Sequence, residues 1–163
     1  MKIIKRIPAD DWYSVRDPKH FYAAMRSDVQ LLLTHRAYLS LTTIIFCCID
    51  AIAAGSGKAT RDKFGSFVAR HFPDLLGEIE RASPGRKGTE VLYAEFRNGF
   101  AHLRAPKPKF AIAEDHELDG QWAGLIETTG GIRVLALNVD RLAREFLTMM
   151  EQLDPGAQRS VIP

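Results

Sequence analysis

Residues 39–54, LSLTTIIFCCIDAIAA, form the most apolar stretch of the chain and decide its fold. A membrane-spanning helix needs about 20 predominantly apolar residues, whereas this stretch is shorter and is interrupted by Ser40, two threonines and Asp50. It therefore predicts a buried helix from about Arg36 to Ala54. Because apolar side chains would surround this helix on almost every side, we expect it at the centre of a helical bundle.

The segments on either side carry the apolar spacing of further helices. Phe21, Met25 and Val29 recur every four residues behind Asp17-Pro18, a pair typical of a helix start. The same reasoning along the chain predicts a mainly α fold, a bundle of four to six helices. The helices are expected over residues 18–33, 36–54, 60–71, 73–81, 89–105 and 139–153.

A small sheet is expected before the last helix. Three short runs are predicted to be strands: residues 110–118, 121–128 and 132–137. Asp119-Gly120 and Gly130-Gly131 separate them, and both pairs suit two-residue hairpin turns. The sequence therefore predicts an antiparallel β-meander at about 109–137, inserted in the helical bundle, with Asn138 capping the helix that follows.

A single domain is expected over residues 18–154, between an N-terminal arm (1–17) and a loose tail (155–163). The N-terminus, MKIIKR, lacks the apolar run of a secretory leader. Cys47 and Cys48 are adjacent in the apolar helix, which favours two buried free thiols. Such thiols suit a reducing compartment, so we expect a cytoplasmic protein that does not associate with membranes.

Neither a metal site nor a cofactor site is predicted. GSGKAT, residues 55–60, lacks the first glycine and the hydroxyl after lysine that a phosphate loop requires. The acidic residues 114–119 match no zinc or calcium spacing, so a solvated face is expected there. His71 is expected to be a surface or capping histidine. The net charge of +2 is too small to indicate nucleic-acid binding by itself.

Asp50 stands out because a carboxylate in an apolar helix needs a partner. The sequence favours Lys58 or Arg61, just beyond the end of the helix. The alternative is that Asp50 is an acid that orients Arg97 or His102.

The stretch Arg97-Asn98-Gly99-Phe100-Ala101-His102 carries the residues best suited to chemistry. Arg97 and His102 are five positions apart, which on an ideal α-helix separates their side chains by about 140° around the axis. The two side chains would therefore flank the apolar stripe of the helix on opposite sides. They could meet if the helix loosened near Gly99, or if two copies of it packed about a two-fold axis. Asn98 lies one turn before His102, on the same face.

These side chains can do phosphodiester chemistry. Arg97 offers a planar, always charged fork to phosphate oxygens, and His102 can move a proton near neutral pH. Together they suffice for attack of an RNA 2′-hydroxyl on its own phosphate without a metal ion, leaving a 2′,3′-cyclic phosphate. Asn98 would position a group. Arg104, Lys107 and Lys109 follow closely, so RNA near Arg97 would meet several positive charges.

The motif resembles that of the HEPN family: an arginine, often a polar residue such as asparagine, and a histidine four to six positions after the arginine. The resemblance extends over roughly residues 18–104 and 138–153. It implies a dimeric α-helical bundle, with Arg97 and His102 at the family's catalytic positions and Asn98 at the polar one. One toxin subgroup carries a tyrosine two residues after the histidine, where this chain has Arg104.

Many members of that family are metal-independent endoribonucleases of toxin–antitoxin, phage-defence or RNA-processing systems. The resemblance thus implies a homodimer that cuts RNA at a dimer cleft, with an antitoxin as a possible partner. Two alternatives stay open. The chain could be a non-catalytic RNA- or nucleotide-binding module, or an antitoxin-type dimer partner in which Arg97 only pairs with Glu90 or Glu95 and His102 only caps its helix.

Overall fold

The computed structural model describes residues 18–55, 57–103 and 107–153, with the backbone but not the side chains of residues 18–20, 102 and 103. The predicted arm (1–17), Arg104 and the predicted tail (155–163) lie outside the described residues. The helices and strands follow one another in this order: α1 (Pro18–Thr34), α2 (Tyr38–Ala54), α3 (Arg61–His71), α4 (Pro73–Ala82), α5 (Gly88–Val91), the π-helix η2 (Leu92–Arg97), α6 (Asn98–Leu103), β1 (Phe110–Ala113), the 3-10 helix η3 (Asp115–Glu117), β2 (Ala123–Glu127), β3 (Arg133–Asn138) and α7 (Val139–Leu153).

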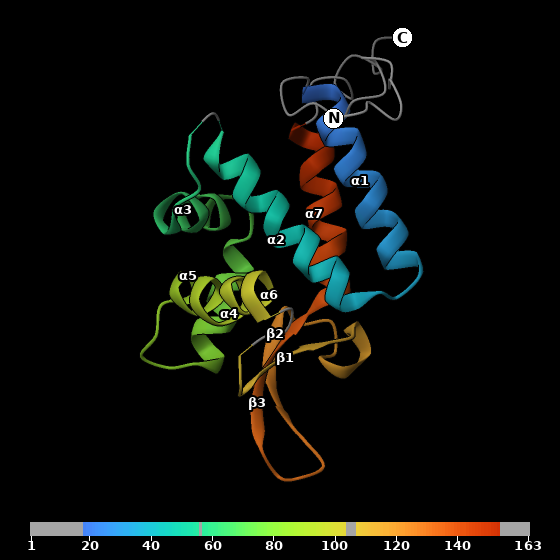
Figure 1. Ribbon diagram of the computed structural model, residues 1–163. Helices are drawn as coiled ribbons and strands as arrows, with labels where there is room; N and C mark the ends of the chain where they lie inside the picture. Colours follow the sequence, from blue (N-terminus) through green and yellow to red (C-terminus); the bar gives the residue numbers. More distant parts are fainter. Residues whose placement is uncertain (1–17, 56, 104–106, 154–163) are drawn as a thin grey trace, which may run out of the picture.

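Helix α2 lies at the centre of the bundle, as its composition predicts. It runs between α3 on one side and α1 and α7 on the other (Figure 1). Leu41, Ile45 and Ile49 are fully or almost fully buried along it. The ring of Phe46 lies 6.2 Å from that of Phe64 in α3 and 6.0 Å from that of Phe100 in α6. One aromatic side chain thus joins three helices.

The sheet lies between α6 and α7, as predicted, but it is not an antiparallel meander. Its strand order is β1-β3-β2, with β2 antiparallel to β3 and β1 parallel to β3. The predicted first strand ends at Ala113 because Glu114 is the N-cap of η3 and forms a capping box with Glu117. The chain then turns at Asp119 and Gly120, both with positive φ, and β1 pairs with the third strand along the chain.

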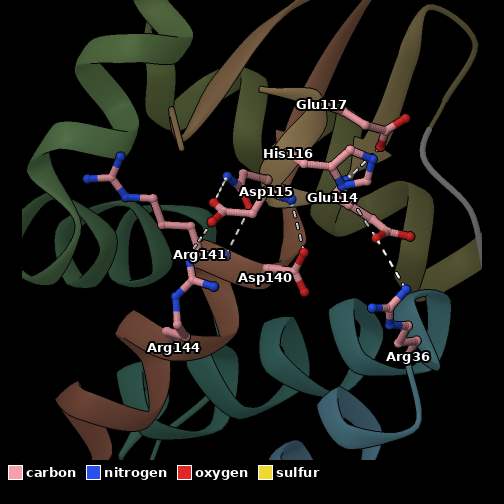
Figure 2. Close-up of polar contacts among 9 residues, drawn as sticks. Arg36, Glu114, Asp115, His116, Glu117, Asp140, Arg141 and Arg144 are labelled. Carbon is pink, nitrogen blue, oxygen red and sulfur yellow. Dashed lines mark hydrogen bonds and ion pairs between the residues drawn. The ribbon is translucent and has the colours of Figure 1, made fainter. Parts of the chain in front are cut away.

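A polar network fixes this insertion to α7 (Figure 2). Asn138 is fully buried; its side-chain oxygen accepts the Arg141 backbone N–H at 2.9 Å, so it caps α7 as predicted. Its amide also donates to Asp115 at 2.7 Å, and Arg144 lies 3.1 Å from that carboxylate. The Asn138 hydrogen bond, then the arginines, hold the pKa of Asp115 below its ordinary value. The acidic stretch 114–119 is therefore not simply a solvated face, because Asp115 connects the insertion to α7.

Candidate functional site

The segment that carries the Arg97 motif is a helix with an irregular middle. Residues 92–97 form a π-helix, in which the Asn98 N–H bonds to the carbonyl of Tyr93, and α6 then resumes regular α geometry through Gly99. The irregular turn ends at Arg97, two residues before Gly99, and Gly99 itself, where loosening was one of the two possibilities, lies in regular α-helix. A π-turn inside an α-helix is rare and is found most often at functional sites.

Arg97 is the partner of Asp50. Its Nε donates to Asp50 Oδ2 at 2.7 Å, and its Nη2 lies 2.5 Å from the same oxygen. The two side chains are 19% and 13% exposed, so they meet in a largely dry setting. The sequence favoured Lys58 or Arg61 as the partner of Asp50, and this was wrong, because Arg61 lies 3.2 Å from Glu90. The alternative, that Asp50 orients Arg97, agrees with the contact.

Two neighbours complete the cradle around Arg97. Its Nη1 donates to the side-chain oxygen of Asn98 at 2.8 Å. Its guanidinium carbon lies 5.1 Å from the centre of the Tyr93 ring, in a cation–π contact. Tyr93 in turn meets Phe64 of α3 edge-on at 5.3 Å. Sequence reasoning missed Tyr93, although its position four residues before Arg97 was a usable signal.

The cradle leaves hydrogen-bonding capacity unused. A guanidinium carries five N–H donors, and the contacts with Asp50 and Asn98 use three of them. Asp50 Oδ1 is buried and has no hydrogen-bond partner within the described part of the chain. Among the described residues, the contacts of Arg97 thus leave two of its N–H donors available for another group.

Lys107, one of the predicted RNA-binding lysines, pairs with Glu95 and not with a residue of this cradle. Lys107 Nζ is 3.6 Å from Glu95, and its backbone N–H bonds to the Glu95 carbonyl at 3.2 Å. Glu95 precedes Arg97 by two positions, and side chains two apart leave a helix on roughly opposite sides. Lys109 is exposed, with a φ of 70°. The structure brings Arg97, Asn98 and Asp50 together, but not Lys107.

His102 lies in α6, and its side chain falls outside the described part. Because the backbone from Asn98 to Leu103 is regular α-helix, positions 97 and 102 are about 140° apart around the axis. The sequence offers two ways to bring Arg97 and His102 together. Loosening of the helix near Gly99 is one, and the packing of two copies about a two-fold axis is the other.

The thiols beside the site differ from each other. Cys48 is buried, as expected, and burial raises its pKa to about 12. Cys47 is exposed, contrary to expectation. Desolvation, followed by the nearby Asp50 carboxylate, raises the pKa of Cys47 above its ordinary value. A thiol of that kind stays protonated at neutral pH, so Cys47 is a poor nucleophile.

Within residues 18–55, 57–103 and 107–153, no group of three or more His, Cys, Asp or Glu side chains could hold a metal ion. Over the same residues, no helix is long and apolar enough to cross a membrane.

In comparisons with known proteins, the chain matches no family model, no curated protein and no solved structure.

Proposed function

We propose that this protein is a metal-independent endoribonuclease, acting in the cytoplasm as a homodimer within a toxin–antitoxin or defence system. One observation carries the proposal: Asp50, Asn98 and Tyr93 hold the guanidinium of Arg97 at the end of a π-helix, directly before the helix that contains His102. An arginine fixed in this way is ready to receive a phosphate.

Each residue has a role in the proposed reaction. The 2′-hydroxyl of the substrate attacks the adjacent phosphorus, and the bond to the leaving 5′-oxygen breaks. His102 is the general acid/base: the 2′-hydroxyl loses its proton and the leaving 5′-oxygen gains one. Arg97 stabilises the charge that builds on the phosphoryl oxygens, through the two N–H donors that have no partner among the described residues. Asp50 and Asn98 are positioning residues that fix the plane of the guanidinium.

The homodimer is part of the proposal because α6 is too regular to bring Arg97 and His102 of one copy together. If two copies pack through this helix, Arg97 of one copy lies across the cleft from His102 of the other. Light scattering should then show a dimer at micromolar concentration. A monomer that still cuts RNA would contradict the shared site.

The test of the activity is cleavage of mixed cellular RNA in EDTA, with analysis of the ends. Products with a 2′,3′-cyclic phosphate and a 5′-hydroxyl are expected, and 2′-deoxy substitution at the scissile position should abolish cutting. His102→Ala should lose about 10²–10⁴-fold in rate, and Arg97→Ala about 10²–10³-fold.

Arg133→Ala is the matched control, because Arg133 is 75% exposed on β3. It should cut like the wild type. Equal cutting by all the variants would assign the activity to a contaminant.

The same ion pair also favours a second candidate. Arg97 satisfies Asp50, so the pair could serve stability alone in a non-catalytic RNA-binding module or an antitoxin-type dimer partner. This alternative predicts that the wild type, with or without its cellular partner, leaves RNA intact. It also predicts that Arg97→Lys, which keeps the charge but loses the fork, is impaired only in stability.

A further inference from the structure

An open hollow of about 500 Å³ lies between the end of α2 and α3. It has the size of a small-ligand site. Its lining includes two apolar residues of α2 and four residues of α3 with aromatic or cationic side chains: Ile52, Ala53, Lys63, Phe67, Arg70 and His71. We call it the α3 hollow.

Two rings of the α3 hollow lie against each other in a tilted arrangement. The rings of Phe67 and His71, one helical turn apart, have their centres 4.5 Å from each other and are inclined by 37°. Burial, then the charge of Arg70, lowers the pKa of His71 below its ordinary value. His71 is therefore mainly neutral at neutral pH. A neutral imidazole on a phenyl ring offers the type of aromatic surface on which unpaired bases stack.

Cationic side chains flank these rings. Lys63 and Arg70 both line the α3 hollow and are exposed, while Asp62 is the carboxylate among its lining residues. Lys63 also donates to the carbonyl of Ala54 at 3.2 Å, which fixes its ammonium beside the end of α2. Rings and cations on one helix are the combination that single-strand-binding surfaces use.

The α3 hollow and the Arg97 cradle are built on the same two helices, α2 and α3. Ala53, which lines it, follows Asp50 by three residues on α2, a rise of about 4.5 Å along the axis and nearly the same face. On the other side, Phe64 of α3 contacts Tyr93, the ring beneath Arg97. A strand with one phosphate at Arg97 would thus have a neighbouring nucleotide next to α3.

We propose that the α3 hollow binds one unstacked base of single-stranded RNA on the Phe67–His71 pair, with Lys63 and Arg70 on the flanking phosphates. The inference rests on the proposed function, since it places the hollow beside the nucleotide that Arg97 contacts. It makes the hollow a subsite that selects unpaired over paired RNA, because a base inside a duplex cannot reach the rings.

The test uses a short single-stranded RNA with 2′-O-methyl groups, which prevent the proposed cleavage, and 2-aminopurine at one position. Stacking should quench the 2-aminopurine when the wild type binds. His71→Ala should abolish the quenching and weaken binding about five- to hundredfold, the range for losing one base stack. Arg70→Glu should flatten the dependence of log affinity on log salt by about 0.7 for each phosphate that the variant no longer neutralises. Arg133→Glu, with the same charge change on β3, should bind like the wild type.

The outcomes separate the two proposals. Quenching and its loss in His71→Ala, together with a wild type that cuts no RNA, would support the subsite and reject the nuclease. Normal cutting and binding by both α3 variants would overturn the subsite and leave the nuclease standing. Displacement of the RNA by equimolar adenosine monophosphate would overturn the strand assignment in favour of a free nucleotide. Equal affinity for a duplex of the same sequence would overturn the proposed selection of unpaired bases.

Discussion

Replacing Asp50 with alanine should destabilise the protein by about 3 kcal/mol. The change removes one partner of a largely buried ion pair, which commonly costs about 3–5 kcal/mol because it leaves the other charge unpaired. Arg97 is 19% and Asp50 13% exposed, so water can partly compensate, and we take the low end of that range. For a chain of this length, a loss of about 3 kcal/mol lowers Tm by roughly 6–12 °C.

The measurement is a double-mutant cycle in urea with Asp50→Ala, Arg97→Ala and the double variant. If the pair acts as the structure indicates, the double variant should be little less stable than either single variant, with a coupling energy of about 2 kcal/mol. Asp50→Asn keeps an oxygen that can accept from Arg97 and should lose less than Asp50→Ala. Additivity within about 0.5 kcal/mol would refute the reasoning, since independent residues add.

Three further predictions concern other parts of the chain. Gly88→Ala should lower the free energy of unfolding in urea by about 1–3 kcal/mol, because the new Cβ would lie 2.6 Å from a backbone carbonyl oxygen of α4. The matched control, Gly65→Ala, should raise it by about 0.5–1 kcal/mol, because its Cβ would meet only an ordinary contact at 3.6 Å. The folded-state pKa of Asp115 lies below the ordinary aspartate value of 3.8. The contribution of Asp115 to stability is therefore fully present above pH 3.8 and is lost as the pH falls through the folded pKa. Asp115→Asn should flatten the acid limb of a curve of stability against pH, and an unchanged limb would contradict this. With a disulfide reagent under native conditions, Cys47 should react slowly at neutral pH and faster as the pH rises beyond 9.0, the ordinary pKa of a cysteine thiol. Cys48 is buried and should react only on unfolding. Equal reaction rates for the two thiols would contradict this.

Features that depend on local sequence could be predicted. The apolar run around Ile45 and Ile49 predicts a central helix because composition alone places it in the core, and both residues are buried. Asn138 follows a strand and precedes an amphipathic segment, which is sufficient to identify a cap, and it is the N-cap of α7. In each case the residues on which the prediction depends lie within one or two helical turns of the feature itself.

Features that depend on distant partners could not be predicted. The partner of β1 is β3, beyond η3 and β2, and hairpin statistics favour the adjacent strand. Asp50 and Arg97 are 47 positions apart, so Arg61 was the nearer candidate. Residues 92–97, LYAEFR, all tolerate an α-helix, so their composition gives no sign of the π geometry. Of the cradle around Arg97, the sequence therefore offers Asn98 and, as the less favoured alternative, Asp50, but neither Tyr93 nor the π geometry.

The π-helix makes the site depend on the number of residues in one turn as well as on their identity. A π-turn holds one residue more than the α-helical turn it replaces. Deleting a residue such as Ala94, which precedes Arg97, would let the segment continue as an α-helix with its ends unmoved. The ends would then keep their orientation, so Arg97 would stay on Asp50 and Phe100 in the core. The residues of the turn itself would shift, because Tyr93 would lie three positions before Arg97 and no longer four. A one-residue deletion in this turn would therefore separate the contact of Arg97 with the Tyr93 ring from its contact with Asp50.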